Sequence, residues 1–429
     1  MTDKKRIFLD YASITPIDPK VEAEMVKTQK KFWANPSSLH TEGENAKNAL
    51  EKARIEIARF LHCRSSEIFF TSGGTESLNM AILGVIKSAR KKIPSPHIIV
   101  SSIEHPAVLE PIKNLFKDVE VSFISPDQNG EVNPESVKRE IKDNTVLLII
   151  QHANNEIGTL QPIQKISGLI KEYRKDLNTD PKSNYPYLLV DASQSALYEN
   201  VSLERLGADL LVLDGIKIYG PRATGILAVK HGIKISPIIF GGGQESGLRS
   251  GTENVAGAVG MSKALEILLK IKQKELLRLT ALRDYTIAKI LKEFKNSSLN
   301  GSQENRLPNN INICFPGQDS EFLVIKLDIL GFAVSAASAC HTLSLENGSY
   351  VIESLGKPEC SSSSLRITLG RYTKKTDIDK FIFFRNAEVA APTREINIFP
   401  LFFHQLMILS HPFILILPAF STLFLVGEK

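Results

Sequence analysis

The segment Tyr187-Leu188-Leu189-Val190-Asp191 is a short apolar run that ends at an acidic side chain. Four similar runs occur between residues 65 and 230, and longer amphipathic stretches separate them. This alternation is typical of βαβ units and a mostly parallel sheet. We therefore predict an α/β fold whose large domain has such a sheet flanked by helices. The other runs are residues 67–70, 97–100, 146–150 and 210–213.

Small and polar residues follow every one of these runs. In open α/β sheets, ligands bind outside the carboxyl ends of the strands, so the five segments together predict a binding site at one sheet edge. The same residue types also serve as turns and helix caps, and that alternative holds for any single segment. The segments are residues 71–76, 101–105, 151–156, 191–194 and 214–217.

The pattern changes in the second half of the chain. Residues 254–295 are rich in Leu, Lys and Ala and predict one or two long helices, and short strands follow from about residue 308. We expect an N-terminal segment that packs with the small domain, a large domain that binds the cofactor, a smaller α+β domain and an atypical apolar tail. These four regions are residues 1–20, 21–265, 266–385 and 386–429.

The composition is that of an ordinary globular protein. Among 429 residues, 52 are Lys or Arg and 47 are Asp or Glu, a net charge of +5 without a basic block, so we expect no direct contact with nucleic acid. The four cysteines show no metal-binding spacing, and we expect neither a disulfide framework nor a zinc site. The N-terminus lacks the apolar segment of a secretion signal, which favours a cytoplasmic protein.

The C-terminal tail differs from the rest of the chain. Residues 397–427 contain no Asp, Glu, Lys or Arg, and the stretch is long enough to span a bilayer. Three prolines interrupt it and would kink or break a helix. A membrane anchor therefore competes with two alternatives, which are a tail covered by the protein or a partner and a sequence unrelated to the ancestral C-terminus.

The predicted strand ends carry the groups that an aromatic aldehyde phosphate would need. Lys217 can supply an amine, Asp191 can hold a ring nitrogen protonated, and His105 can stack on the ring. Residues 73–77 open a predicted helix, whose free N–H groups and dipole favour a phosphate. Each feature is common by itself. Hydrogen bonds to a ring hydroxyl would come from Asn155 and Gln194.

Nine motifs occur in the order found in a known family. On these motifs the chain resembles the cysteine desulfurases, pyridoxal-phosphate enzymes of the class V aminotransferase family, over roughly residues 6–383. The resemblance implies an aminotransferase-like fold of type I and, from the loop around Cys340, the longer-loop branch. The motifs are LDYASITPIDP, FWANPSSLH, TSGGTES, SSIEHPAV, ANNEIGTLQPI, VDASQS, KIYGP, GGGQESGLRSGTEN and SLRITLGRYT.

The resemblance implies a role for each candidate residue. Cys340 would carry sulfur as a persulfide, Lys217 would form the Schiff base, and His105 would act as the stacking acid/base. Arg366, together with Asn155, would bind the substrate carboxylate. Pyridoxal 5'-phosphate would contact Lys217, Gly74, Thr75, His105, Asn155, Asp191, Gln194 and, from the partner subunit of a homodimer, Thr252.

The implied reaction converts L-cysteine to L-alanine. Sulfur would pass to an iron–sulfur scaffold or another acceptor protein, for cluster assembly or tRNA thiolation. No metal site is expected, and whether Cys340 also binds a shared cluster stays open. The alternatives are a selenocysteine lyase or another class V lyase, and a non-catalytic or membrane-tethered relative. The remaining cysteines, which we expect in core or loop positions, are Cys63, Cys314 and Cys360.

One motif departs from the family. The family has Ser-Gly-His-Lys where this chain has Asp214-Gly215-Ile216-Lys217. Ile216 cannot donate a hydrogen bond, and an ionised Asp214 would repel a phosphate dianion unless it turned away or paired with a cation. The sequence therefore predicts weaker binding of the cofactor.

Overall fold

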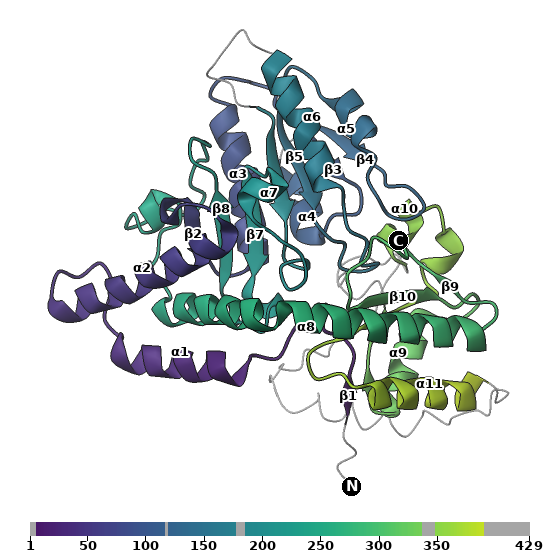
Figure 1. Cartoon of the computed structure of the whole chain (residues 1–429). Coiled ribbons are helices and arrows are strands. Elements are labelled where there is room, and N and C mark those ends of the chain that lie inside the picture. Colours follow the sequence, from purple (N-terminus) through teal and green to yellow (C-terminus); the bar gives the residue numbers. More distant parts are fainter. Residues whose placement is uncertain (1–5, 116–118, 177–184, 337–347, 390–429) are drawn as a thin grey trace, which may run out of the picture. The chain divides into compact units, whose positions relative to one another are not determined.

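The computed structural model describes residues 6–115, 119–176, 185–336 and 348–389 (Figure 1). Its central element is a seven-stranded sheet in the order β2-β8-β7-β6-β5-β3-β4. Five neighbouring strands are parallel, and β8 runs antiparallel to β2 and β7. The strands are β2 (Ile68–Thr71), β3 (His97–Ser101), β4 (Glu120–Ile124), β5 (Thr145–Gln151), β6 (Tyr187–Asp191), β7 (Leu210–Asp214) and β8 (Gly225–Val229).

Helices cover both faces of this sheet. Alternate strand residues point to opposite faces, so Leu189 packs with one buried cluster while Leu188 and Val190 pack with the other. The first cluster includes residues of α3 (Gly74–Ala89) and α4 (Pro106–Leu115), and the second includes residues of α6 (Ile163–Asp176). The predicted α/β class with a mostly parallel sheet is confirmed, and the five predicted apolar runs coincide with β2, β3, β5, β6 and β7.

Four further helices and three 3₁₀ turns are described in this part of the chain. They are α1 (Pro19–Lys31), α2 (Thr41–Leu61), α5 (Pro134–Glu140) and α7 (Leu203–Leu206), with the 3₁₀ turns η1 (Ser65–Glu67), η2 (Gly215–Lys217) and η3 (Glu245–Gly247). The start of α1 has a local cause. Asp18 accepts a hydrogen bond from Lys20 N at 2.9 Å, and Pro19 takes the first helical position, where its missing N–H costs nothing.

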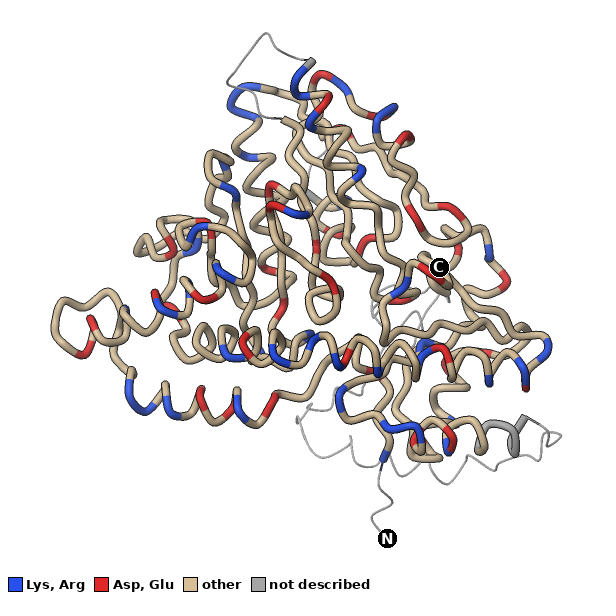
Figure 2. The backbone as a smooth tube through the Cα atoms, in the orientation of Figure 1, with Lys and Arg blue, Asp and Glu red and all other residues tan. Residues whose placement is uncertain are grey.

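A single helix of 39 residues, α8 (Val255–Glu293), packs against α1 and α2 and also against β9 and β10 (Figure 1). Asn254 caps it by accepting a hydrogen bond from Gly257 N at 2.8 Å. The boundary that the sequence predicted between residues 265 and 266 therefore lies inside one continuous helix. Both basic and acidic residues occur along α1 and along α8 (Figure 2).

Two small sheets follow α8. The order of the four-stranded sheet is β12-β13-β10-β9, all antiparallel, and β1 pairs in parallel with β11. These strands are β1 (Ile7–Phe8), β9 (Ser298–Leu299), β10 (Asn310–Cys314), β11 (Phe332–Ala333), β12 (Ser335–Ala336) and β13 (Ser364–Thr368). The accompanying helices are α9 (Ser320–Ile329), α10 (Tyr350–Ser354), η4 (Pro358–Cys360) and α11 (Lys375–Val389).

One prediction about the cysteines is wrong. Cys314, at the end of β10, forms a disulfide with Cys360 in η4. The two positions are 46 residues apart, and only the tertiary fold brings them together, so their spacing could not reveal the bond. Both cysteines are buried, as expected of core positions.

The apolar C-terminal tail, for which a membrane anchor was one of three alternatives, lies outside the described residues. Within the described ranges, which end at residue 389, no helix combines the length and the apolar character needed to cross a bilayer.

Candidate active site

Lys217 ends η2, directly after β7, and its amine is held by the N-terminal segment. The Nζ atom donates hydrogen bonds to the backbone carbonyls of Ala12, at 2.9 Å, and Ser13, at 2.6 Å. Gln194, which follows β6, donates from Nε2 to the same Ala12 carbonyl at 2.9 Å. The side chains that follow two neighbouring parallel strands therefore meet at one short piece of backbone.

Arg366 reaches the same segment from β13. Its side chain is only 2% exposed, and Nη2 donates to Ser13 Oγ at 2.7 Å and to Asp10 Oδ1 at 3.0 Å. Nη1 donates to the Asn155 carbonyl at 3.2 Å. Ser13 therefore accepts hydrogen bonds from both Lys217 and Arg366, which places an amine and a guanidinium at one small site.

Two buried polar atoms at this site lack partners. Asn155 Oδ1 and Arg366 Nε are buried and make no hydrogen bond within the described part of the chain. Since buried polar groups in proteins are nearly always hydrogen-bonded, such atoms indicate a place where a ligand supplies the missing partners. Asn155 lies in the loop after β5, at the predicted sheet edge.

Asp191 ends β6, where its Oδ1 accepts a hydrogen bond from Ser193 N at 2.9 Å. Glu104 is fully buried, and its Oε1 accepts from Gln151 N at 2.8 Å. Burial raises the pKa of Glu104 well above its usual value, and the nearby charge of Asp191 raises it further. Glu104 thus holds its proton more tightly than an exposed carboxyl group does.

His105 follows Glu104 and is half-buried. Its Nδ1 accepts a hydrogen bond from Ala107 N at 3.1 Å. A ring nitrogen that accepts cannot carry the proton, so the neutral ring is protonated at Nε2. That tautomer presents an N–H donor on the side of the ring away from the α4 backbone.

The N-terminus of α3 is contacted by the carboxylate of Asp214, which ends β7. Asp214 Oδ2 accepts a hydrogen bond from Gly74 N at 3.0 Å, and Oδ1 accepts from Ile216 N at 3.2 Å. Burial raises the pKa of Asp214, with a smaller contribution from Asp191. The Asp214 side chain thus points at the turn that the sequence assigns to a phosphate, while Thr75 is exposed.

The described chain on both sides of Cys340 lies beside this site. Before it, Ser335 of β12 is paired with Arg366. After it, Ser349 donates from Oγ to Glu156 Oε2 at 2.5 Å, next to Asn155. Burial raises the pKa of Glu156 to about 7. Cys340 itself lies outside the described residues.

Comparison with known proteins places the chain in a family. The model of the family described as "Aminotransferase class-V" matches residues 7–381. A curated relative, "Cysteine desulfurase IscS" of Dictyoglomus turgidum, is 43% identical over 378 residues, 88% of this chain and 92% of the relative. The chain belongs to the class-V aminotransferases, among the cysteine desulfurases. "Cysteine desulfurase IscS 1" of Archaeoglobus fulgidus is 42% identical, covering 87% of this chain and 94% of its own.

Two solved structures superpose on most of the chain. A "NIFS-LIKE PROTEIN" superposes with a TM-score of 0.82 at 31% identity, covering 90% of this chain and 99% of its own. The structure titled "SspA in complex with cysteine" superposes with a TM-score of 0.71 at 33% identity and covers 86% of this chain and 99% of its own. The predicted family resemblance and fold type are confirmed.

Not every candidate residue of this cysteine desulfurase family member lies at the Lys217 site. Thr252 is exposed and lines a separate small pocket with Arg249 and Thr224. Cys63, half-buried on the C-terminal side of α2, has a pKa raised to about 12 by burial, so its thiol stays protonated at neutral pH.

Sequence reasoning missed four polar residues of the site. Asp10 and Ser13 hold Arg366, while Glu104 and Glu156 are buried acids in the loops that carry His105 and Asn155. Glu104 and Glu156 lie inside two of the quoted motifs, each next to a residue that had been predicted for the site. Their position in the motif could therefore have identified them as site residues. Asp10 and Ser13 also lie inside a quoted motif, LDYASITPIDP, but no role was assigned to them, because only the tertiary fold brings this segment against Arg366 and Lys217.

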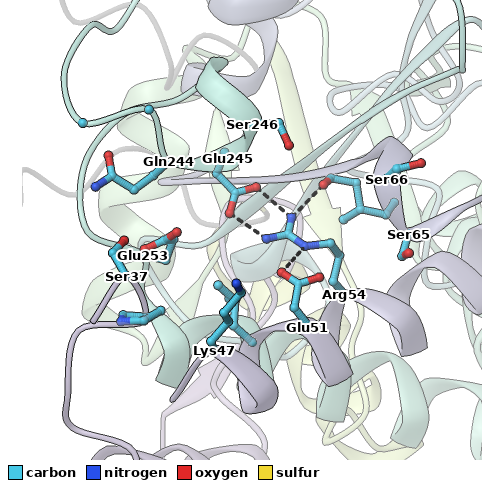
Figure 3. A pocket seen from close by; sticks show the side chains of 15 residues that line it. Ser37, Lys47, Glu51, Arg54, Ser65, Ser66, Gln244, Glu245, Ser246 and Glu253 are labelled. Carbon is cyan, nitrogen blue, oxygen red and sulfur yellow. Dashed lines mark hydrogen bonds and ion pairs between the residues drawn. The ribbon is translucent and has the colours of Figure 1, made fainter. Parts of the chain in front are cut away.

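A separate cavity of about 510 Å³ lies between α2 and residues 242–246, and no sequence-predicted site residue lines it (Figure 3). On its wall, Arg54 Nη1 and Nη2 donate to the two carboxylate oxygens of Glu245 at 2.7 and 2.9 Å. Glu245 also accepts from Phe70 N at 2.9 Å, and Arg54 Nε donates to Glu51 at 3.1 Å. Both partners of the Arg54–Glu245 pair are buried.

Proposed function

We propose that the chain is a pyridoxal-phosphate-dependent L-cysteine desulfurase, which forms L-alanine and a persulfide on Cys340. One observation carries the proposal. Ser13 accepts hydrogen bonds from both Lys217 and Arg366, so an amine for a carbonyl cofactor lies beside a guanidinium for a substrate carboxylate. The names of the relatives support the same activity.

The residues present fit pyridoxal 5'-phosphate. The unpartnered Oδ1 of buried Asn155 supports this fit, since a ring hydroxyl would satisfy the amide there. When bound, the cofactor supplies an electron-withdrawing ring that stabilises negative charge at the substrate α-carbon. The residues that we expect to hold it are Lys217, Asp191, His105, Asn155, Gln194, Gly74 and Thr75, with Thr252 contributed by the partner subunit of a homodimer.

Residues of this chain would bind the substrate and transfer its protons. The Arg366 guanidinium binds the substrate carboxylate, with Asn155 beside it. Asp191 keeps a proton on the ring nitrogen, and Lys217 moves the proton of the substrate α-carbon through Nζ.

The sulfur step needs no added oxidant. The Cys340 thiolate attacks the sulfur of the substrate, the bond between that sulfur and the β-carbon breaks, and the electron pair of this bond remains with the carbon fragment. Protonation of that fragment yields L-alanine, and Cys340 retains a persulfide. We propose that an acceptor protein then takes the sulfur for iron–sulfur cluster assembly or tRNA thiolation, in the cytoplasm.

A selenocysteine lyase remains the second candidate, and Cys340 separates the two functions. We would record the absorbance spectrum of the protein with the cofactor before and after adding L-cysteine, and assay alanine and sulfide. Cys340→Ala should keep the cofactor band and lose alanine formation, whereas Lys217→Ala should lose the band. Cys63→Ala is the matched control and should leave both unchanged, because its thiol stays protonated. Alanine formation in Cys340→Ala at the wild-type rate would overturn the proposal.

A further inference from the structure

The position that a phosphate would take at the start of α3 is contacted by a side chain of this protein. Asp214 accepts hydrogen bonds from Gly74 N and Ile216 N, so one carboxylate caps both α3 and η2. A Cβ atom added at Gly74 would lie only 3.0 Å from Asp214 Oδ2. The carboxylate is therefore in close contact with the helix N-terminus rather than turned away from it.

A helix N-terminus attracts one anion strongly, because its free N–H groups and its dipole act at the same point. At the end of the 16-residue helix α3, the Gly74 N–H already donates to a carboxylate. A phosphate that approaches the same N–H meets a like charge, which disfavours the ionised form of Asp214. The carboxylate and the phosphate therefore compete for this donor.

The charged groups around Asp214 do not cancel that repulsion. Lys217, on η2, lowers the pKa of Asp214, but Asp191, at the end of β6, raises it, and burial raises it most. On α3 itself, Glu76 faces Arg249, to which it is ion-paired at 2.8 Å. In addition, the Lys217 amine donates to Ala12 and Ser13.

We propose that Asp214 competes with the phosphate of the cofactor for Gly74 N–H, and that binding of a phosphate monoester is coupled to uptake of one proton by Asp214. The inference rests on the proposed function, since it takes the cofactor phosphate to bind at α3. The proton comes from solvent and bonds to a carboxylate oxygen, and the neutral carboxyl group can then donate a hydrogen bond to the phosphate. Cofactor affinity in this chain therefore falls as pH rises.

The experiment compares pyridoxal 5'-phosphate with pyridoxal, which lacks the phosphate. Dissociation constants would be measured by absorbance titration of the cofactor-free protein between pH 7 and 9, where the phosphate is already a dianion. The affinity advantage of the phosphorylated ligand is the dissociation constant of pyridoxal divided by that of pyridoxal 5'-phosphate. For the wild type, this ratio should fall by up to about tenfold per pH unit. In Asp214→Asn and Asp214→Ser, which retain an acceptor for Gly74 N, the advantage should be constant and larger at pH 8.

Calorimetry supplies a second readout. In two buffers of different ionisation enthalpy, the wild type should take up more protons with pyridoxal 5'-phosphate than with pyridoxal, whereas Asp214→Asn should show no difference. Asp319→Asn is the matched control, because Asp319 caps α9 by accepting from Phe322 N at 2.7 Å and lies outside the site. This control should behave as the wild type.

Inorganic phosphate separates failure of this inference from failure of the proposed function. If neither ligand binds the wild type, the cofactor assignment fails, but phosphate should still raise the melting temperature of Asp214→Asn more than that of the wild type at pH 8. The inference is overturned if phosphate stabilises the wild type and Asp214→Asn equally. It is also overturned if the affinity for pyridoxal 5'-phosphate depends on pH in the same way in these two proteins.

Discussion

Arg366 and Asp10 are 356 residues apart in the sequence, yet Arg366 Nη2 lies 3.0 Å from Asp10 Oδ1. The guanidinium is almost fully buried, and Asp10 is the carboxylate with which it forms an ion pair. We expect Asp10→Ala to lower the free energy of unfolding by about 3 kcal/mol, because it leaves a buried cation unpaired. Urea denaturation measures this change. Asp328→Ala, which breaks the exposed Arg6–Asp328 pair, should cost less than about 1 kcal/mol.

The buried pair Arg54–Glu245 should behave in the same way (Figure 3). Glu245→Ala removes the acceptor of both Arg54 and Phe70 N, and we expect a loss of about 3–5 kcal/mol in the free energy of unfolding. The double variant Arg54→Leu with Glu245→Leu should lose less, because no buried charge is left over. Glu51→Ala removes only a half-exposed partner of Arg54 and is the control. Equal losses in Glu51→Ala and Glu245→Ala would contradict this account.

Glu156 makes stability depend on pH. Its pKa is raised to about 7 in the folded protein, above its ordinary value of about 4.5, so the folded state binds the proton more tightly than the unfolded state. The stability that the protonated group provides is fully present below about pH 4.5 and is lost as pH rises to about 7. We expect Glu156→Gln to be more stable than the wild type at pH 8, by up to about 3 kcal/mol, with little difference at pH 5.

Thermal denaturation of the wild type and of Glu156→Gln across pH 5–8 measures this effect. Glu135→Gln, at an exposed position of α5, is a suitable control and should not alter the pH profile. A wild-type profile that Glu156→Gln leaves unchanged would show that folding does not raise the pKa of this carboxyl group.

The Cys314–Cys360 disulfide closes a loop across a separation of 46 residues and ties η4 to the end of β10. Restricting the unfolded chain over a loop of this length stabilises a protein by about 2–4 kcal/mol. Cys314→Ser with Cys360→Ser should therefore unfold at a lower urea concentration, and a reductant should lower the wild-type midpoint toward that of the double variant. A reductant that shifts the double variant equally would mean that its effect does not come from this bond.

The strands of the large sheet could be predicted where they are apolar throughout, as in β5 and β6, because burial on both faces leaves a continuous hydrophobic run. Sequence reasoning did not identify β4, whose residues are mostly not buried, or β8, which pairs antiparallel between β2 and β7. Neither strand carries a candidate residue, so the predicted sheet edge still contained Lys217 and Asp191.

The rule of strand ends could predict only those site residues that follow strands, whereas Arg366, which lies within β13, was implied by the family resemblance. The rule that ligands bind at strand ends located Asp191 and Lys217, whereas Asp10 and Ser13 lie in an N-terminal turn whose place depends on contacts with β11, β13 and η2. The direction of the Asp214 side chain could not be predicted either, because it depends on the distance between β7 and the start of α3. The disulfide is a third case, since no spacing rule connects Cys314 with Cys360.

The contact between the N-terminal segment and β13 also has a consequence for synthesis on the ribosome. Asp10 leaves the ribosome early, but Arg366 follows 356 residues later. At about 5–20 residues per second, the partner arrives roughly 20–70 s after Asp10 has been made. In the last part of that interval, after β8 (Gly225–Val229) has been made, the large sheet has all its strands, yet Asp10 still lacks the guanidinium that pairs with it in the folded protein.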